Sequence, residues 1–505
     1  MIAKKKWWIA GIACLLVCLL IPFCYLLRER QLDEIRDEAL KKLEWDIGQY
    51  DDRSIVLHNT SPVKAKKLAE QFGATLRITK DGRFATLTLP EGVTIRDISA
   101  REDAHNYIED MAADYQVQVS ELNEGETEEF TGKRIPARPT CSVSDSDYEL
   151  QSYLDYLNMQ NVWNTYTGTG VTVAVIDTGI DTDHPEFSGR ISEYSYNATE
   201  DKIVKDWLCE DGGYDWSLIE DEQGHGTAVT GVIAASMNSG KVVGIAPDVN
   251  IIVIKAECDK NGVFKRTSDL VFGLYYAIER NVQVVNMSFG GGSLADWKAP
   301  VQLAYDSDII CVAAAGNNGT SALAYPAACE KVIGVGALAS DSWTLADYSN
   351  YGENSDIVAP GTTYTTLIDG TYGTQNGTSL ATPAVTAAVA LYMQNNQYVA
   401  VDQVTEVLFA SCYDLGNLGN DWEYGYGALD LSAFLLEERG TVTYDMLSDE
   451  LENEEGFFIR GHALQELPEP ERLYAVFDGW YYDDTFTQAV EYYTDAFYGD
   501  LTLYL

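Results

Sequence analysis

The chain has 505 residues, which is enough for about two to four domains, and its 46% hydrophobic content is ordinary for a globular protein. It has 78 Asp and Glu residues against 34 Lys and Arg, which gives a formal net charge of -44 at pH 7. Such a surface repels nucleic acid and anionic lipid headgroups, so we expect no nucleic-acid partner. Basic peptides, or solubility alone, remain as reasons for the charge.

The first expected element is a membrane-spanning helix. Residues 7–27 form an apolar run without a charged side chain, and about 20 such residues suffice to cross a bilayer. Lysines precede the run and Arg28 and Arg30 follow it, which modestly favours a cytoplasmic N terminus. No convincing small-x-small cleavage site follows, so we expect an uncleaved anchor within residues 1–27 rather than a cleaved or lipidated leader. The rest of this single-pass protein of the cell membrane would then lie outside the cell, unless later processing sheds it.

The segment after the anchor predicts a helix and then a small α+β unit. Residues 28–53 have apolar side chains at helical spacing among many charges, as in a juxtamembrane helix. Residues 54–121 then alternate strand and helix patterns. In order we expect a strand at 54–58, a helix at 61–72, strands at 74–79 and 84–89, a helix at 95–115 and a closing strand at 116–122. This β-α-β-β-α-β order is the ferredoxin-like split-βαβ plan.

A linker, a large domain and a small module follow. Residues 122–147 are rich in Glu, Pro, Ser, Thr and Gly, which is typical of an exposed linker where proteolytic processing concentrates. Residues 148–437 alternate helical stretches with apolar β-branched runs such as VTVAVI and IIVIKA, which predicts an α/β domain with a mainly parallel sheet covered on both faces. Residues 438–505 carry no Lys and many Asp, Glu, Tyr and Phe residues, so we expect a separate small module there.

Three reactive residues in the large domain come at the ends of these patterns. Asp177 follows the apolar strand 171–176, His225 opens a helical run after Gly224, and Ser379 stands near the start of another helix. The carboxyl ends of strands in open α/β sheets are where active sites form. A serine hydroxyl is a weak nucleophile that needs an adjacent base, and imidazole is suited to that task. A carboxylate, an imidazole and a serine hydroxyl at such positions are the groups that a catalytic triad combines.

The segments around these residues, together with VVNMSFGGG (284–292) and AAAGNNG (313–319), resemble the subtilase family of serine proteases over residues 148–437. The resemblance implies a subtilisin-like three-layer fold and endopeptidase activity on proteins and peptides, with an acyl-enzyme intermediate. It implies that Asp177, His225 and Ser379 form the triad and that Asn317 donates its side-chain amide to the oxyanion. No cofactor is needed for that chemistry.

The same resemblance implies where substrate binds. Ser288, Phe289 and Gly290 match the strand with which family substrates pair as an added β-strand. The opposite wall of the main specificity pocket would be formed by Ala314, Ala315 and Gly316, with Ala324 near its base. Small, uncharged residues there predict an apolar and permissive pocket.

A structural calcium ion is a further expectation from the family. Segment 231–247 matches the family's calcium loop without a gap. The ligands would be the carbonyl oxygens of Ser236, Gly240 and Val242, the amide oxygen of Asn238 and the carboxylate of Glu186. The best-known members have Asp where this chain has Glu186, so the side chain that carries the carboxylate is one methylene group longer here.

The flanking units carry two further resemblances. Residues 54–121 are similar in position, size and strand order to the inhibitor-type propeptide of subtilases, which implies that the protein's own propeptide is an intramolecular inhibitor. The motifs LPEPERLYAVFDGWYYD and GDLTLYL in residues 438–505 resemble the internalin-type B-repeat, a small β-rich element of proteins displayed on bacterial envelopes. Two other interpretations stay open: a peptide-binding scaffold, and an adhesin whose protease domain serves only self-maturation.

Overall fold

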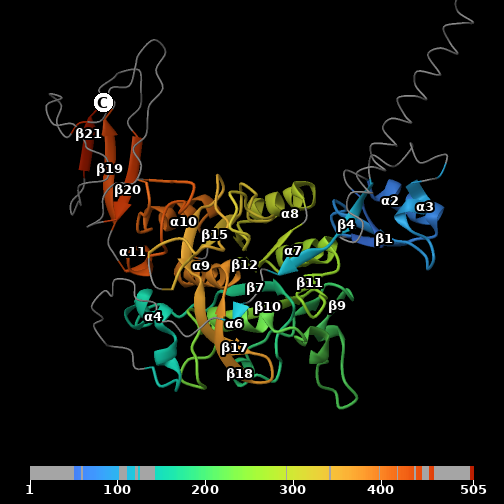
Figure 1. Ribbon diagram of the computed structural model, residues 1–505, viewed down its shortest axis with the longest axis horizontal. Helices are drawn as coiled ribbons and strands as arrows, with labels where there is room; N and C mark the ends of the chain where they lie inside the picture. The colour runs from blue at the N-terminus through green and yellow to red at the C-terminus, as the bar shows by residue number, and fades with distance from the viewer. Residues whose placement is uncertain are drawn as a thin grey trace, which may run out of the picture. The chain divides into compact units, whose positions relative to one another are not determined.

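The protein's structure is a computed structural model that describes fourteen segments of the chain (Figure 1). These are residues 50–57, 61–99, 101, 111–119, 123–124, 143–291, 293–340, 343–396, 398–417, 419–436, 439–445, 454–459, 481 and 501–504. The expected anchor at residues 7–27 lies outside them, and no helix within them is long and apolar enough to cross a bilayer. Five cysteines in the described segments, Cys209, Cys258, Cys311, Cys329 and Cys412, are free thiols.

The chain forms two compact units, Met1–Gln116 and Val117–Leu505. In the first, the described elements are β1 (Tyr50–Leu57), α2 (Pro62–Phe72), β2 (Thr75–Ile78), β3 (Ala85–Thr88), α3 (Ile95–Ser99) and β4 (Met111–Tyr115). The sheet has the order β2-β3-β1-β4 with every pair antiparallel, as the split-βαβ plan predicts. The Ser61 side chain caps α2 at its start, and Gly73, in the left-handed conformation, ends it.

Three expected boundaries in this region were wrong. Residues 50–53, the end of the helix expected over 28–53, belong to strand β1, and the rest of that expected helix lies outside the described residues. Residues 111–115, expected to be helical, form β4, because they pair with β1 and the buried Asp114 carboxylate accepts a hydrogen bond from Ser54 Oγ at 2.7 Å. Val117–Val119, part of the strand expected at 116–122 to close this sheet, instead forms β5 of a different sheet in the second unit. Tertiary pairing here outweighs the local helical preference of the sequence.

The second unit is built on an eight-stranded sheet in the order β16-β15-β14-β12-β7-β10-β8-β9. Every pair is parallel except the edge pair β8–β9. The strands are β7 (Thr172–Asp177), β8 (Tyr196–Asn197), β9 (Lys202–Ile203), β10 (Asn250–Lys255), β12 (Val284–Met287), β14 (Ile310–Ala314), β15 (Ile333–Leu338) and β16 (Ile357–Pro360). Their near-continuous apolar sequences are those of strands buried on both faces, as predicted.

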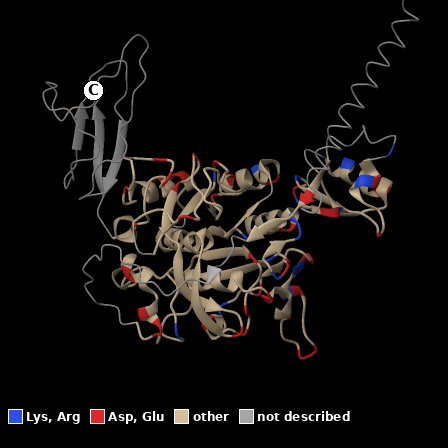
Figure 2. Ribbon diagram, viewed as in Figure 1, with Lys and Arg blue, Asp and Glu red and all other residues tan. Residues whose placement is uncertain are grey.

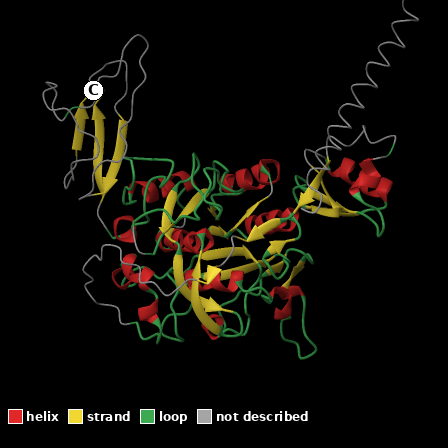
Figure 3. Ribbon diagram, in the orientation of Figure 1, coloured by secondary structure: helices red, strands yellow, loops and turns green. Residues whose placement is uncertain are grey.

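Helices cover both faces of this sheet, which makes three layers (Figure 3). Successive strand residues point to opposite faces. Val173 and Val175 of β7 join a core cluster with α6 (His225–Ala234) and α9 (Thr378–Met393). Ile176 points the other way, toward α7 (Thr267–Glu279), where a Cβ on Gly273 would lie 3.3 Å from its Cγ2. Helix α8 (Leu294–Asp306) packs beside α7.

Shorter elements complete the second unit. The helices are η3 (Tyr148–Leu150), α4 (Ser152–Tyr156), α5 (Met159–Val162), η4 (Pro185–Phe187), η5 (Val204–Asp206), η6 (Trp216–Ile219), α10 (Val401–Ala410) and α11 (Leu431–Leu435). The strands β11 (Val263–Phe264), β5 and β13 (Phe289–Gly291) form one small sheet, and β17 (Thr362–Leu367), β18 (Thr371–Asn376) and β6 (Asn123–Glu124) form another. Toward the C terminus, β19 (Arg439–Asp445) pairs antiparallel with β20 (Glu454–Ile459) and parallel with β21 (Leu501–Tyr504).

The acidic residues of the second unit are spread over many loops rather than gathered in one patch (Figure 2). This distribution favours solubility as the reason for the formal net charge of -44, since a dedicated binding site for basic partners would concentrate the carboxylates.

Candidate active site

Asp177 and His225 meet at the carboxyl edge of the main sheet. Asp177 is the last residue of β7 and His225 the first of α6, and both side chains are fully buried. His225 Nδ1 lies 2.7 Å from Asp177 Oδ1. The helix can approach the strand this closely because residue 226 is Gly: a Cβ there would lie 2.2 Å from the carbonyl oxygen of Gly179. The structure therefore brings the predicted acid and base together.

The other ring nitrogen of His225 is available for proton transfer. His225 Nε2 and Asp177 Oδ2 are buried, and neither has a hydrogen-bond partner among the described residues. With Nδ1 donating its proton to the carboxylate, Nε2 carries the lone pair of a general base. Catalytic hydrogen bonds are often long before substrate binds, so an open Nε2 suits this role.

Ser379 is the second residue of α9, a helix that packs against α6. Its backbone carbonyl accepts a hydrogen bond from Ser288 Oγ at 2.9 Å. That contact joins the start of α9 to the segment between β12 and β13, where substrate pairing is predicted. Helix α6 begins at His225, and helix α9 begins one residue before Ser379. The two helices thus lie in the same layer and pack together.

Asn317 is anchored beside Ser379 by its side-chain oxygen. Its Oδ1 accepts hydrogen bonds from the backbone N–H of Thr378 at 3.0 Å and from Thr378 Oγ1 at 2.8 Å. The backbone N–H can only donate, so the atom that faces it must be the oxygen. This fixes the Asn317 amide orientation and leaves its NH₂ group as the donor that the oxyanion role requires.

The predicted pocket residues also gather in one place. A Cβ on Gly290 would lie 2.5 Å from Ala324 Cβ, and one on Gly316 would lie 3.6 Å from the same atom. The N–H of Ala324 donates to the carbonyl of Ala315 at 2.9 Å. Ala314 and Ala315 are fully buried at the end of β14. Gly290 and Gly316, which lack a Cβ, therefore let Ala324 approach both segments closely, and the predicted pocket residues lie side by side.

The segment Val117–Val119, which the sequence placed elsewhere, lies along the predicted substrate-binding strand. It is the middle strand of the sheet β11-β5-β13 and is antiparallel to both neighbours. Gln118 stands opposite Gly290, and Val119 opposite Phe289. Val117 and Val119 are 1% exposed, whereas Gln118 is exposed. The apolar-polar-apolar alternation of V-Q-V indicates a strand, but it does not show which sheet that strand joins.

The two valines cover an aromatic face of this small sheet. Residues directly opposite each other in antiparallel strands share a face, which groups Val117 with Phe264 and Val119 with Phe289. The rings of Phe264 and Phe289 pack edge to face at 5.8 Å between centroids, and Trp297 packs on Phe289 at 5.8 Å. β5 therefore buries apolar surface at the position where a substrate strand is expected.

Glu186, the predicted calcium carboxylate, is fully buried. Its Oε1 accepts hydrogen bonds from the N–H groups of Lys241 at 2.7 Å and Val242 at 3.3 Å, and from the Tyr372 hydroxyl at 3.0 Å. Its Oε2 has no hydrogen-bond partner among the described residues. Gly240 makes room for the longer arm of Glu186, because a Cβ there would lie 2.0 Å from Oε1.

The rest of the predicted calcium loop is held partly by residues that the sequence did not suggest. Asn238 Oδ1 accepts hydrogen bonds from the N–H of Ser144 at 2.6 Å and from its hydroxyl at 2.9 Å. The Asp145 carboxylate accepts hydrogen bonds from the backbone N–H groups of Asn238, Ser239 and Gly240. The hydroxyl of Ser239 donates to the carbonyl of Ser236 at 3.3 Å. The described residues contain no group of three or more His, Cys, Asp or Glu side chains that could hold a metal ion.

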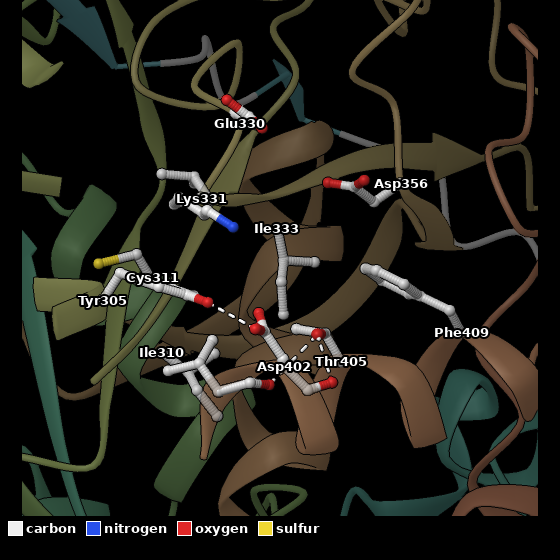
Figure 4. A pocket seen from close by; sticks show the side chains of 12 residues that line it. Tyr305, Ile310, Cys311, Glu330, Lys331, Ile333, Asp356, Asp402, Thr405 and Phe409 are labelled. Atoms are coloured by element: carbon white, nitrogen blue, oxygen red, sulfur yellow. Dashed lines mark hydrogen bonds between the residues drawn. The ribbon is translucent and has the colours of Figure 1, made fainter. Parts of the chain in front are cut away.

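A separate pocket of about 80 Å³ lies between α10 and the first residues of β14 and β15 (Figure 4). Its walls include Tyr305, Lys331, Asp356, Asp402 and Phe409. The Tyr305 hydroxyl donates to Asp402, and burial raises the pKa of Asp356 to about 7. This pocket is at the amino ends of the strands, whereas Asp177 is at a carboxyl end, and no predicted site residue lines it.

The geometry agrees with the comparison to known families. A family model described as the subtilase family matches residues 168–427, which is just over half of the chain. The chain belongs to the subtilase family. The Paenibacillus polymyxa intracellular serine protease is 38% identical over 253 residues, covering 49% of this chain and 73% of that protein. Subtilisin E of Bacillus subtilis (strain 168) is 38% identical over 275 residues, covering 53% of this chain and 66% of that protein. This subtilase is therefore a subtilisin-like serine protease, which is a hydrolase.

Among solved structures, this subtilase is similar to fervidolysin from Fervidobacterium pennivorans, which is described as a keratinolytic enzyme related to subtilisin. The TM-score is 0.65 at 23% identity, over 79% of this chain and 64% of that one. At this identity the likeness shows the fold alone. It agrees with the three-layer α/β architecture and its mainly parallel sheet.

Proposed function

We propose that this protease is an endopeptidase that cuts proteins with Asp177, His225 and Ser379 as its triad. The observation that carries the proposal is the 2.7 Å contact between His225 Nδ1 and Asp177 Oδ1, which leaves Nε2 facing no described partner. The order of the three residues along the chain and the packing of α6 on α9 support the same assignment. A peptide-binding scaffold would not need an imidazole paired with a buried carboxylate.

The mechanism follows from these positions. As Ser379 Oγ attacks the substrate carbonyl carbon, its proton passes to His225 Nε2, and Asp177 stabilises the imidazolium that forms. The negative charge that develops on the carbonyl oxygen is met by the Asn317 amide and the backbone N–H of Ser379. His225 then gives the proton to the leaving amine as the C–N bond breaks. A water molecule, deprotonated by His225, hydrolyses the acyl-enzyme and restores the Ser379 hydroxyl.

This mechanism is tested with two variants and a control. Ser379→Ala should abolish peptide hydrolysis. Asn317→Ala should lower kcat by about 10²–10³ with little change in KM, since the amide acts on the transition state. The exposed neighbour provides the control, Asn318→Ala, which should keep wild-type kcat. Equal hydrolysis by wild type and Ser379→Ala would refute the triad and favour the scaffold interpretation.

We further propose that residues 54–121 are an inhibitory propeptide. β5 supports this, because it occupies the edge of β13 and buries both of its valines there. The next described strand, β6 (Asn123–Glu124), pairs with β18. β13 begins one residue after Ser288, which contacts Ser379, and β18 ends three residues before Ser379. The flanking strands therefore lead to the nucleophile from both sides, as a substrate would.

The first cut should be intramolecular and fall between Val119 and Asn123, at the start of the predicted linker 122–147. A tethered segment has an effective concentration on the order of mM, so cleavage in cis is favoured. N-terminal sequencing of the mature enzyme should find residue 120, 121, 122 or 123 first, and Ser379→Ala should accumulate uncut. Cleavage of that variant at the same bond in a protease-deficient host would contradict self-processing.

We also propose that a calcium ion binds at Glu186. The buried Oε2, which has no hydrogen-bond partner among the described residues, fits a hard cation. Asn238 would have to release Ser144 before its Oδ1 could contribute. If the ion binds, 1 mM CaCl₂ should raise the Tm of Ser379→Ala over that in EDTA, because an ion at 100 times its Kd stabilises the folded state by about 2.7 kcal/mol. An unchanged Tm would refute the site.

Display on the outer face of a bacterial membrane and a B-repeat-like C-terminal module rest on the sequence motifs. The sheet of β19, β20 and β21 is in keeping with a small β-rich module at 438–505. The adhesin interpretation, in which the protease serves only maturation, predicts that Ser379→Ala blocks surface adhesion but not turnover of other proteins.

A further inference from the structure

Asp221, in the loop before α6, is a buried carboxylate with five hydrogen-bond donors around it. It is only 4% exposed. Its Oδ1 accepts from Thr178 Oγ1 at 2.9 Å and from the N–H groups of Gln223 at 3.0 Å and Gly224 at 2.8 Å. Its Oδ2 accepts from the N–H of Thr227 at 2.9 Å and from its hydroxyl at 2.7 Å. None of these donors is a cation, so the charge is held by neutral dipoles alone.

On one side this network reaches Asp177 through a single residue. The N–H of Thr178 donates to Asp177 Oδ1 at 2.8 Å, the same oxygen that lies 2.7 Å from His225 Nδ1. The hydroxyl of Thr178 donates to Asp221 and accepts the N–H of Gly226 at 2.9 Å. Thr178 thus ties the Asp177 backbone both to Asp221 and to the residue after His225.

On the other side the network encloses His225. Gly224 precedes it and Thr227 follows two residues later, and both donate backbone N–H groups to Asp221. The His225 N–H itself donates to Gln223 Oε1 at 2.8 Å. These N–H groups belong to the start of α6, where a helix has no internal partners for them. Asp221 therefore fixes the first turn of the helix that presents the imidazole.

Capping alone does not account for this arrangement. A Ser or Asn side chain caps a helix about as well as Asp, without the cost of a buried charge. Burying a carboxylate without a cationic partner is unfavourable unless many donors compensate. Here the donors come from both segments of the catalytic pair, so Asp221 is a second carboxylate, besides Asp177, that bonds the end of β7 and the start of α6 together. Its negative charge also favours the imidazolium that forms during turnover.

We propose that Asp221 is a positioning residue of the catalytic centre, which fixes Asp177 and His225 relative to each other through Thr178 and the first turn of α6. This inference rests on the proposed catalytic roles of Asp177 and His225. A small misplacement of such a pair slows turnover much more than it weakens substrate binding.

The test compares Asp221→Asn with a matched variant of another buried carboxylate. Asp269 is 2% exposed, lies in the first turn of α7 and bonds Thr199 and Arg266, so Asp269→Asn is the control. The enzyme is produced as the full-length chain and assayed after self-processing, with active sites counted by titration. Asp221→Asn should then lower kcat about 10- to 100-fold and leave KM within about twofold. Asp269→Asn should lower Tm but keep kcat. The downfield proton resonance of the His225–Asp177 hydrogen bond should shift only in Asp221→Asn.

A second pair of variants decides the matter if Asp221→Asn fails to fold. Thr178→Val removes the hydroxyl that joins Asp221 to Gly226 and keeps the side-chain shape, whereas Thr178→Ser keeps the hydroxyl. We expect a lower kcat in Thr178→Val and near wild-type kcat in Thr178→Ser. A kcat within twofold of wild type in Asp221→Asn, or in both Thr178 variants, would overturn the positioning role. Failure of the wild type itself to hydrolyse peptides would instead refute the proposed function, so the two outcomes are distinguishable.

Discussion

His184 is a buried histidine outside the catalytic pair whose protonation is coupled to folding. Its Nδ1 accepts the N–H of Glu186 at 3.2 Å, and its Nε2 lies 3.2 Å from the carbonyl oxygen of Thr371. A ring that accepts at one nitrogen and donates at the other is neutral. Burial lowers the pKa of His184 below its usual value of 6.5. Acid must therefore work against the folded state at this site.

The sign of the pH effect follows from linkage. Because the folded pKa is lower than the unfolded pKa, the unfolded chain binds the proton first as the pH falls. The contribution of His184 to stability is complete above about pH 6.5 and is lost as the pH falls through the lowered folded value. In the Ser379→Ala background, His184→Gln should therefore reduce the Tm difference between pH 8 and pH 5. The same Tm difference with and without His184 would show that other groups cause it.

At the scale of elements, the sequence predicted the main sheet and the helix starts well. Runs such as VTVAVI are buried on both faces, and only a parallel sheet inside two helical layers offers that environment. The position of Asp177 was predictable for the same reason, since it stands at the end of such a run, whereas His225 and Ser379 lie at the predicted starts of helices. Asp177 and His225 are in contact as expected.

The small pairings were not predictable, because each depends on a distant partner. Residues 111–115 have a helical composition but pair with β1, and V-Q-V at 117–119 fits any sheet edge with an apolar face. The roles of Asp145 and Asp221 depend likewise on which backbone N–H groups the fold turns toward them. Local sequence patterns carry no information about such long-range contacts.

If residues 54–121 are the inhibitory propeptide proposed above, the burial of β5 predicts which side chains their inhibition depends on. Val117 is 1% exposed and stands opposite Phe264, so a charge there would be buried without a partner. Residues 54–121 carrying Val117→Asp should inhibit the mature enzyme at least about tenfold more weakly, because roughly 1.4 kcal/mol is already a factor of ten. Gln118 is exposed between the two valines and provides the control, Gln118→Asp. Equal inhibition constants for the two variants would refute the binding of β5 between β11 and β13.

At the scale of the whole molecule, the sequence predicts an anchor at residues 1–27 and a catalytic domain outside the cell. Protease added to intact cells should then remove the chain beyond about residue 30 and leave an N-terminal tag protected, since about 20 apolar residues span the bilayer. Immunoblotting for tags at both ends of the chain distinguishes the protected N terminus from the part that the added protease removes. Loss of the N-terminal tag from intact cells, or a mature protein without residues 1–27, would contradict the anchor.

The central claim, that Ser379 is the nucleophile activated by His225 and Asp177, is tested most directly by covalent labelling. A fluorophosphonate reacts with a serine only where a base activates the hydroxyl. Mass spectrometry of the labelled, processed enzyme should place one adduct on the peptide that contains Ser379, and Ser379→Ala and His225→Ala should remain unlabelled. An adduct on a different serine, or equal labelling of Ser379→Ala, would contradict the account.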